Sequence, residues 1–145
     1  MTYPDNILRG ISIPNAIQED GNVLPTAFYF DYETRKRRSD GLIEQSINWQ
    51  DDIQAIPFTL AQKHKTGGLQ FPCGLAIIPR AEIDAFSARR TVAGRLRYER
   101  DPKDDNPYHG NLTLTSDTPK ITMKMIAANL AMLMSRRVPQ ATSQG

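Results

Sequence analysis

The chain has 145 residues, with 18 Lys and Arg against 16 Asp and Glu, and a formal net charge of +2. This length suits one domain with its own core. A single cysteine, Cys73, excludes an internal disulfide framework and a Cys-cluster zinc site. No apolar stretch could span a bilayer and no leader pattern opens the chain, so we expect a cytoplasmic protein with no membrane partner. We expect a single globular domain over 1–138 and a flexible tail over 139–145.

The positive charge is concentrated near the C-terminus. Residues 119–145 contain four basic residues and no acidic one: Lys120, Lys124, Arg136 and Arg137. The first 118 residues therefore hold 14 basic and 16 acidic side chains, a net charge of −2. Such a body lacks the strongly basic balance that is usual in a nucleic-acid-binding domain.

The first half of the chain predicts short elements. Pro and Gly interrupt brief apolar runs over 1–25, which is typical of turns and short extended pieces. The aromatic segment 27–30 predicts a strand. Residues 41–49 fit either a strand or a loop. Apolar residues at helical spacing over 50–65 predict a helix that Pro57 shortens or breaks.

The second half gives clearer signals. The apolar run 75–78 predicts a buried strand, and 79–86 predicts a helix with Pro at its start. Alternation of apolar and polar residues predicts strands over 92–98 and 112–115. Residues 101–110 are rich in Asp, Asn and Pro, so they are expected to form a long hairpin tip between those strands.

A long C-terminal helix is expected next. Ser116, Asp117 and Thr118 before Pro119 form a helix-start signal, and the pattern predicts a helix to about Arg137. At about 100° per residue the helix has apolar residues on both flanks of a narrow polar stripe. It is therefore either a central core helix or a helix with one face for a partner.

The partner hypothesis makes this chain a small accessory or adaptor subunit that is not an enzyme. Its partner would be another protein or a second copy of the chain. The residues assigned to the contact are the apolar ones of the helix: Met123, Met125, Ile126, Leu130, Met132, Leu133 and Met134.

The hairpin tip offers an alternative, enzymatic function. It combines three carboxylates with one of the two histidines, Asp101, Asp104, Asp105 and His109. Oxygen ligands and an imidazole could serve a metal-assisted hydrolase or transferase, with His109 as general base. This hypothesis predicts a concave pocket that holds His109 beside a carboxylate. The same composition also suits a hairpin tip without chemistry, and the spacing matches no known metal loop, so we expect neither a metal nor a cofactor.

Nucleic-acid binding is a further alternative. A basic run could contact phosphates together with two arginines of the predicted strand 92–98, and nearby aromatic rings could stack on bases. Acidic neighbours would partly cancel that charge. The residues concerned are Arg35, Lys36, Arg37, Arg38, Arg95 and Arg97.

Two resemblances come from short motifs. The segments 8–11 (LRGI), 27–28 (AF), 46–49 (SINW) and 106–110 (NPYHG) resemble a pattern that recurs in small bacterial proteins of unknown function. That resemblance implies a bacterial, single-domain, accessory-type protein and no particular activity. Arg9 and Glu44 resemble the Arg and Glu of ADP-ribosyltransferase-like enzymes, in which Arg binds pyrophosphate and Glu orients the ribose. The Ser-bearing strand motif of those enzymes is missing between them.

Together these patterns predict an α+β fold, in which a small, mostly antiparallel sheet carries a long C-terminal helix on one face. The strands expected in this sheet are 27–30, 75–78, 92–98 and 112–115.

Overall fold

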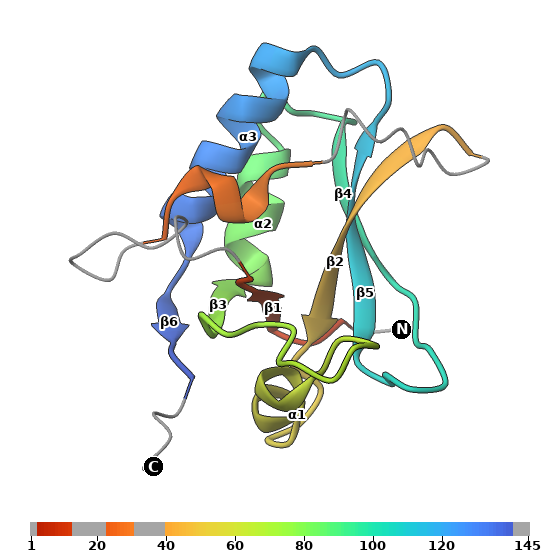
Figure 1. The fold of residues 1–145 in the computed structure, drawn as a ribbon. Helices are drawn as coiled ribbons and strands as arrows, with labels where there is room; N and C mark the ends of the chain where they lie inside the picture. The colour runs from red at the N-terminus through yellow and green to blue at the C-terminus, as the bar shows by residue number, and fades with distance from the viewer. Residues whose placement is uncertain (1–2, 13–22, 31–39, 141–145) are drawn as a thin grey trace.

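The computed structural model describes residues 3–12, 23–30 and 40–140, which form one sheet with helices on both faces (Figure 1). The strands are β1 (Asn6–Gly10), β2 (Leu42–Trp49), β3 (Leu75–Pro79), β4 (Leu96–Arg100), β5 (His109–Thr115) and β6 (Arg136–Val138). The helices are the 3₁₀-helix η2 (Pro25–Phe28) and the α-helices α1 (Ala55–Ala61), α2 (Arg80–Ser87) and α3 (Lys120–Leu133).

The six strands run in the order β4-β5-β2-β1-β3-β6, and every neighbouring pair is antiparallel. The predicted α+β class, with a long helix packed on an antiparallel sheet, is confirmed. No helix of the described segments has both the length and the apolar character to cross a membrane.

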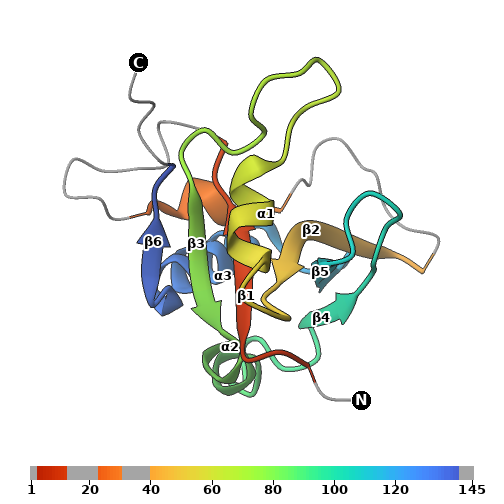
Figure 2. The same ribbon diagram turned by 90° about the horizontal axis from the view of Figure 1, so that it is seen from below.

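Two apolar cores lie on opposite faces of the sheet. The larger contains Ile7, Ile78 and Trp49 and packs against α2, α3 and η2. The smaller contains Leu8 and Ile77, the neighbours of those residues along the strands, and packs against α1. Because successive side chains point to opposite faces, the apolar runs of β1 and β3 supply both cores. Figure 2 shows α1 and α3 on opposite sides of these two strands. The face that carries α1 is called the outer face below.

The predicted strand 27–30 is wrong. Pro25 begins the 3₁₀-helix η2, and the amide of Ala27 donates to the carbonyl of Leu24 at 3.1 Å. Phe28 is fully buried against the larger core. Its aromatic character therefore reflects burial beneath α3 and not membership of the sheet.

Two predicted boundaries also need correction. β4 begins at Leu96 and not at Val92, because Gly94 turns the chain with a φ of +80° and Val92 is buried in the preceding turn. Helix α3 ends at Leu133 and not near Arg137. The amide of Ser135 donates to the carbonyl of Ile77, and the following residues form β6 on the edge of β3.

Candidate functional site

Polar side chains are concentrated on the outer face of β2 and β5. Ser46 and Asn48 alternate with the buried residues Ile47 and Trp49. In the sheet register Ser46 lies opposite Asn111, and Asn48 lies opposite His109. Paired residues of antiparallel strands project from the same face, so these four polar side chains form one patch.

Asn48 is the structural centre of the patch. It is 5% exposed, and its amide donates to Oγ1 of Thr59 at 2.7 Å and to Oε1 of Gln62 at 2.8 Å. Its Oδ1 accepts from Nδ2 of Asn106, in the β4–β5 hairpin, at 2.8 Å. These bonds connect α1, β2 and the hairpin, and they satisfy the buried amide, which would otherwise destabilise the fold.

His109 occupies the next position of the patch with a defined orientation. Its Nδ1 lies 2.9 Å from the main-chain oxygen of Asp101 and 3.5 Å from the Oδ2 carboxylate oxygen. A carbonyl oxygen only accepts hydrogen bonds, so Nδ1 carries the proton. In the neutral ring Nε2 is then an acceptor, and it lies 3.5 Å from Oγ of Ser46. The serine is exposed, so the pair faces solvent.

Asp101 is the carboxylate that the structure brings to His109. It also accepts from Nζ of Lys103 at 3.0 Å and from Nδ2 of Asn111 at 3.4 Å. The hydrogen bond from Lys103 lowers the pKa of the Asp101 carboxyl, with a smaller contribution from Asn111, so Asp101 is ionised beside the imidazole. Asp104 and Asp105 are exposed on the turn between Lys103 and Asn106, and neither has a hydrogen bond or ion pair to His109.

A small cleft opens beside His109 with a volume of about 110 Å³. That is roughly the volume of four water molecules at about 30 Å³ each. Phe71 closes one side against Gly10, where an added Cβ would come within 2.3 Å of the ring. We call it the His109 cleft. Its apolar lining is Leu8, Gly10, Ile47 and Phe71, and its polar lining is Ser46, Asn48, Thr59, Gln62, Gln70, Asn106 and His109.

Arg9 holds Ser46 from the opposite face of the sheet. Its Nη1 donates to the main-chain oxygen of Ser46 at 2.6 Å, and its Nε donates to that of Ala27 at 3.0 Å. Burial lowers the pKa of Arg9 to about 10. Arg9 shares the face of Ile7, whereas Glu44 lies on the outer face with Ser46. The two residues that resemble an ADP-ribosyltransferase pair therefore lie on opposite faces and do not form one site.

The apolar residues of α3 divide into buried and accessible ones. Of those assigned to a partner contact, Met123, Ile126 and Leu130 lie in the larger core, and Met125, Leu133 and Met134 are partly buried against it. Met132 is 81% exposed. Ile121, on the same flank of the helix, is 79% exposed.

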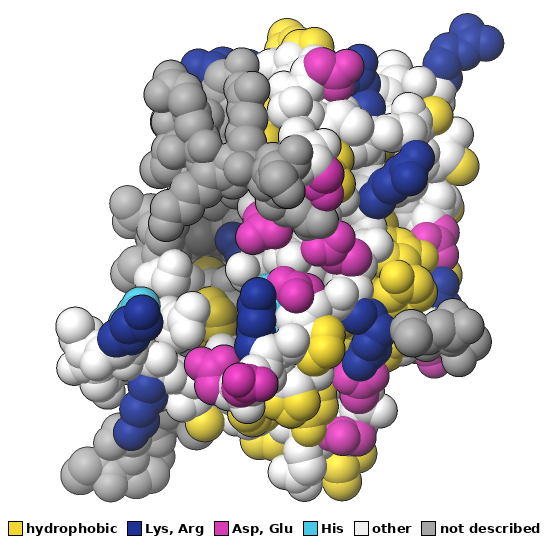
Figure 3. All heavy atoms as spheres, turned by 90° about the vertical axis from the view of Figure 1, so that its right-hand side faces the viewer, with side chains coloured by type: hydrophobic (Ala, Val, Ile, Leu, Met, Phe, Trp, Pro, Cys, Tyr) yellow, Lys and Arg dark blue, Asp and Glu magenta, His cyan; other side chains and the backbone are white. Residues whose placement is uncertain are grey.

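The predicted basic surface is brought together only in part. Arg35, Lys36, Arg37 and Arg38 lie outside the described residues. Arg95 binds Asp117 at 3.5 Å and donates to Thr118, while Arg97 is exposed on β4. Figure 3 looks at the right-hand side of the molecule in Figure 1. On this face Lys and Arg are interspersed with Asp and Glu, and the described residues form no continuous basic patch.

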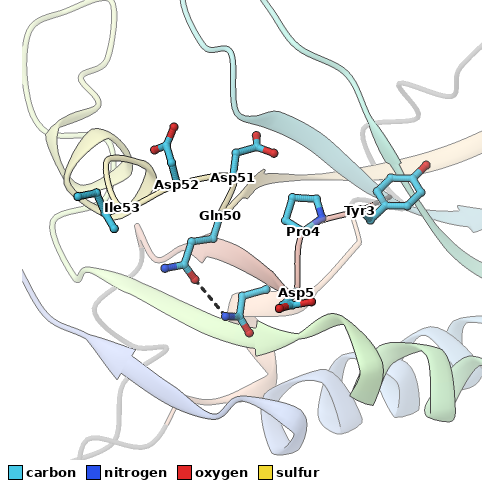
Figure 4. A pocket seen from close by; sticks show the side chains of 8 residues that line it. Tyr3, Pro4, Asp5, Gln50, Asp51, Asp52 and Ile53 are labelled. Atoms are coloured by element: carbon cyan, nitrogen blue, oxygen red, sulfur yellow. Dashed lines mark hydrogen bonds between the residues drawn. The ribbon is translucent and has the colours of Figure 1, made fainter. Parts of the chain in front are cut away.

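A second, wider cleft lies between the start of β1 and the segment after β2 (Figure 4). It has a volume of about 540 Å³, and Asp5, Asp51 and Asp52 line it. Asp51 pairs with Arg100 at 2.7 Å, and Asp52 accepts from the hydroxyl of Tyr108 at 3.0 Å. Among the described residues no group of three His, Cys, Asp or Glu side chains could hold a metal ion.

Three of the four segments that carry the first resemblance, 8–11, 46–49 and 106–110, meet around the His109 cleft, whereas 27–28 lies in the larger core. Gly10, Ser46, Asn48, Asn106 and His109 all line it, although they come from three distant parts of the chain. Sequence reasoning proposed Asp101, Asp104, Asp105 and His109 for this site, and of the three carboxylates only Asp101 contacts His109. It missed Ser46 and Asn48, although their alternation with Ile47 and Trp49 was a strand signal with a polar outer face. Comparison with known proteins found no matching family model, curated protein or solved structure.

Proposed function

We propose that the His109 cleft is the active site of a hydrolase or transferase that acts on a small uncharged group, with His109 as general base. The observation that carries the proposal is the orientation of the imidazole. Asp101 fixes Nδ1, so that Nε2 is the free basic atom at the mouth of the cleft. A base of this kind must reach the proton that it removes, and its tautomer must be set by a second group.

The charges around the imidazole support the same role. Asp101 is ionised and its carboxylate Oδ2 lies 3.5 Å from Nδ1, which is the position of the group that orients a catalytic imidazole. No Asp, Glu, Lys or Arg is among the described residues that line the cleft, so this lining suits an uncharged group. The chemistry proposed here uses these side chains without a metal.

The two histidines of the chain allow a matched test. His64 is exposed in the turn after α1 and outside the His109 cleft. We expect the protein to hydrolyse the small ester p-nitrophenyl acetate, and His109→Gln to lower the rate by about 100-fold, the low end of what a general base contributes. His64→Gln should leave the rate unchanged. Equal rates for the wild type and His109→Gln would refute the proposal.

A second function, docking of another protein on α3, is favoured by the accessible flank of that helix. Ile121 and Met132 are exposed about three turns apart on one flank, and Met125 and Ala128 lie between them. The helix carries Lys120 and Lys124 and no acidic residue, so the complementary partner surface is apolar with an acidic rim. Its cationic character disfavours an antiparallel pair of identical helices.

Site-specific cross-linking can test this second function. We expect a photo-cross-linker at position 132 to capture one defined acidic protein, and a second substitution, Ile121→Lys, to abolish the capture. A cross-linker at Ile53, which is 84% exposed on a different surface, is the control. Capture of the same proteins from both positions, or a cross-linked homodimer from position 132, would contradict the proposal.

A further inference from the structure

We infer that Ser46 is the nucleophile of the His109 cleft, and that the substrate is an ester or amide with a small, uncharged acyl group. The inference rests on the function proposed above and deepens it, because His109 as general base could equally activate water. The argument uses the position of the hydroxyl, the way its backbone is held and the lining of the cleft.

The hydroxyl of Ser46 is placed where a nucleophile needs to be. Its Oγ is exposed at the cleft and lies 3.5 Å from Nε2 of His109, the acceptor nitrogen of the neutral ring. Catalytic contacts are commonly longer in a protein without substrate than in its complex, so this separation fits a serine that approaches the base when substrate binds. The series from Ser46 through His109 to Asp101 has the roles of nucleophile, base and orienting group.

The main chain of Ser46 is held on both sides. Its position in the middle of β2 pairs it with β5, and Arg9 donates to its carbonyl oxygen from the opposite face. Among the described residues, the hydroxyl of Ser46 has a hydrogen-bond contact only with His109. A nucleophile on a regular strand with a fixed backbone keeps its direction of attack, which is the condition for effective positioning.

The cleft limits the substrate. Its volume of about 110 Å³ is well below that of a drug-sized ligand site, so it accepts one small group. Gln62 and Gln70 offer amide groups and Phe71 offers an apolar wall, so the lining suits an uncharged group.

The reaction balances with these groups alone. Oγ of Ser46 attacks the carbonyl carbon, and Nε2 of His109 takes the hydroxyl proton. The bond to the leaving oxygen or nitrogen breaks, and that atom receives the proton from His109. Water then adds to the acyl-serine, with His109 again accepting a proton, and the carboxylic acid leaves while Ser46 regains its hydrogen.

Methanesulfonyl fluoride is a probe small enough for this cleft. Attack by Oγ forms a sulfur–oxygen bond and releases fluoride, and His109 takes the proton. We expect one adduct on Ser46 by peptide mass spectrometry, formed at least about 100-fold more slowly in His109→Gln. Ser135 is the control, since it is exposed and its hydroxyl donates to the carbonyl of Ile77 at 3.2 Å. Ser135→Ala should not change the labelling of Ser46.

The results separate this inference from the proposed function. Labelling of Ser46 that depends on His109, together with loss of ester hydrolysis in Ser46→Ala, supports the nucleophile. Hydrolysis that depends on His109 but persists in Ser46→Ala overturns the nucleophile and leaves His109 as a base for water. Equal labelling of Ser46 and Ser135 also overturns the inference. Hydrolysis that is indifferent to His109 removes the proposed function itself.

Discussion

Asn106 donates its side-chain amide to Oδ1 of Asn48 at 2.8 Å, and both side chains are 5% exposed. Through this bond the β4–β5 hairpin is attached to the strand that carries Ser46. The hairpin in turn positions Asp101 and His109, so the geometry of the His109 cleft depends on a contact between two buried amides rather than on the hairpin sequence alone.

Removing this contact should weaken the fold. Asn48→Ala leaves the buried amide of Asn106 and the oxygen of Gln62 without their partner, so we expect a loss of about 2 kcal/mol in the free energy of unfolding. Urea titration measures it. In the double variant Asn48→Ala/Asn106→Ala the loss of unfolding free energy should be smaller, by about 1 kcal/mol, than the sum of the losses in the two single variants. Additive losses would show that the two residues act independently.

The close approach of Trp49 to Gly110 gives a second prediction. A Cβ on Gly110 would lie 2.3 Å from Nε1 of Trp49 and 2.5 Å from the carbonyl oxygen of Glu99, to which that nitrogen donates. We expect Gly110→Ala to lower the unfolding free energy by about 2 kcal/mol through overpacking. Gly68→Ala, which meets no atom within 4 Å, is the control and should change it by less than about 0.5 kcal/mol. A tolerated Gly110→Ala would contradict this packing.

The carboxyl of Asp101 predicts a dependence on pH. Its pKa is lowered in the folded protein, so its contribution to stability is present above the ordinary carboxyl pKa of about 4 and is lost as the pH falls toward the lowered value. The difference in urea midpoint between the wild type and Asp101→Asn should therefore shrink from about pH 5 to about pH 3. For the exposed Asp104→Asn the difference should stay small throughout. A constant difference for Asp101→Asn would be inconsistent with a lowered pKa.

Helix α3 should respond differently on its two flanks. Leu130 is fully buried, so Leu130→Ala should cost about 3 kcal/mol of unfolding free energy. Met132 is exposed, so Met132→Lys should change it by less than about 0.5 kcal/mol. Thermal and urea unfolding of the two variants provide the comparison. A large loss for Met132→Lys would mean that this flank is buried in the isolated protein.

The sequence predicted the elements whose pattern is local. The apolar run of β3 and the alternation of β5 are visible without tertiary information, and both strands are present. Segment 27–30 was misread because aromatic residues are enriched in strands and are equally suited to burial beneath a helix, as Phe28 is. The predicted end of the last helix was too late because Ser135 and the residues that follow it bond to β3, far away in sequence.

The candidate site was only partly predictable for the same reason. Asp101 and His109 are eight residues apart on one hairpin, so the composition of segment 101–110 alone was enough to suggest them as site residues. Ser46 lies 63 residues from His109, and its place beside the imidazole depends on the register between β2 and β5. A pairing of strands that is set by turns and packing cannot be read from either strand alone.

The central place of β1 has a consequence for how the chain folds. This strand is the first in sequence, yet it lies between β2 and β3 and joins β4-β5-β2 on one side to β3-β6 on the other. During synthesis one edge of β1 can be covered only after residues 42–49 are made, and the other only after residues 75–79 are made. Such long-range pairing slows folding relative to helical proteins of similar size. Deletion of residues 6–10, which form β1, would divide the sheet into two smaller sheets. The newly exposed edges of β2 and β3 could then pair with other chains and aggregate.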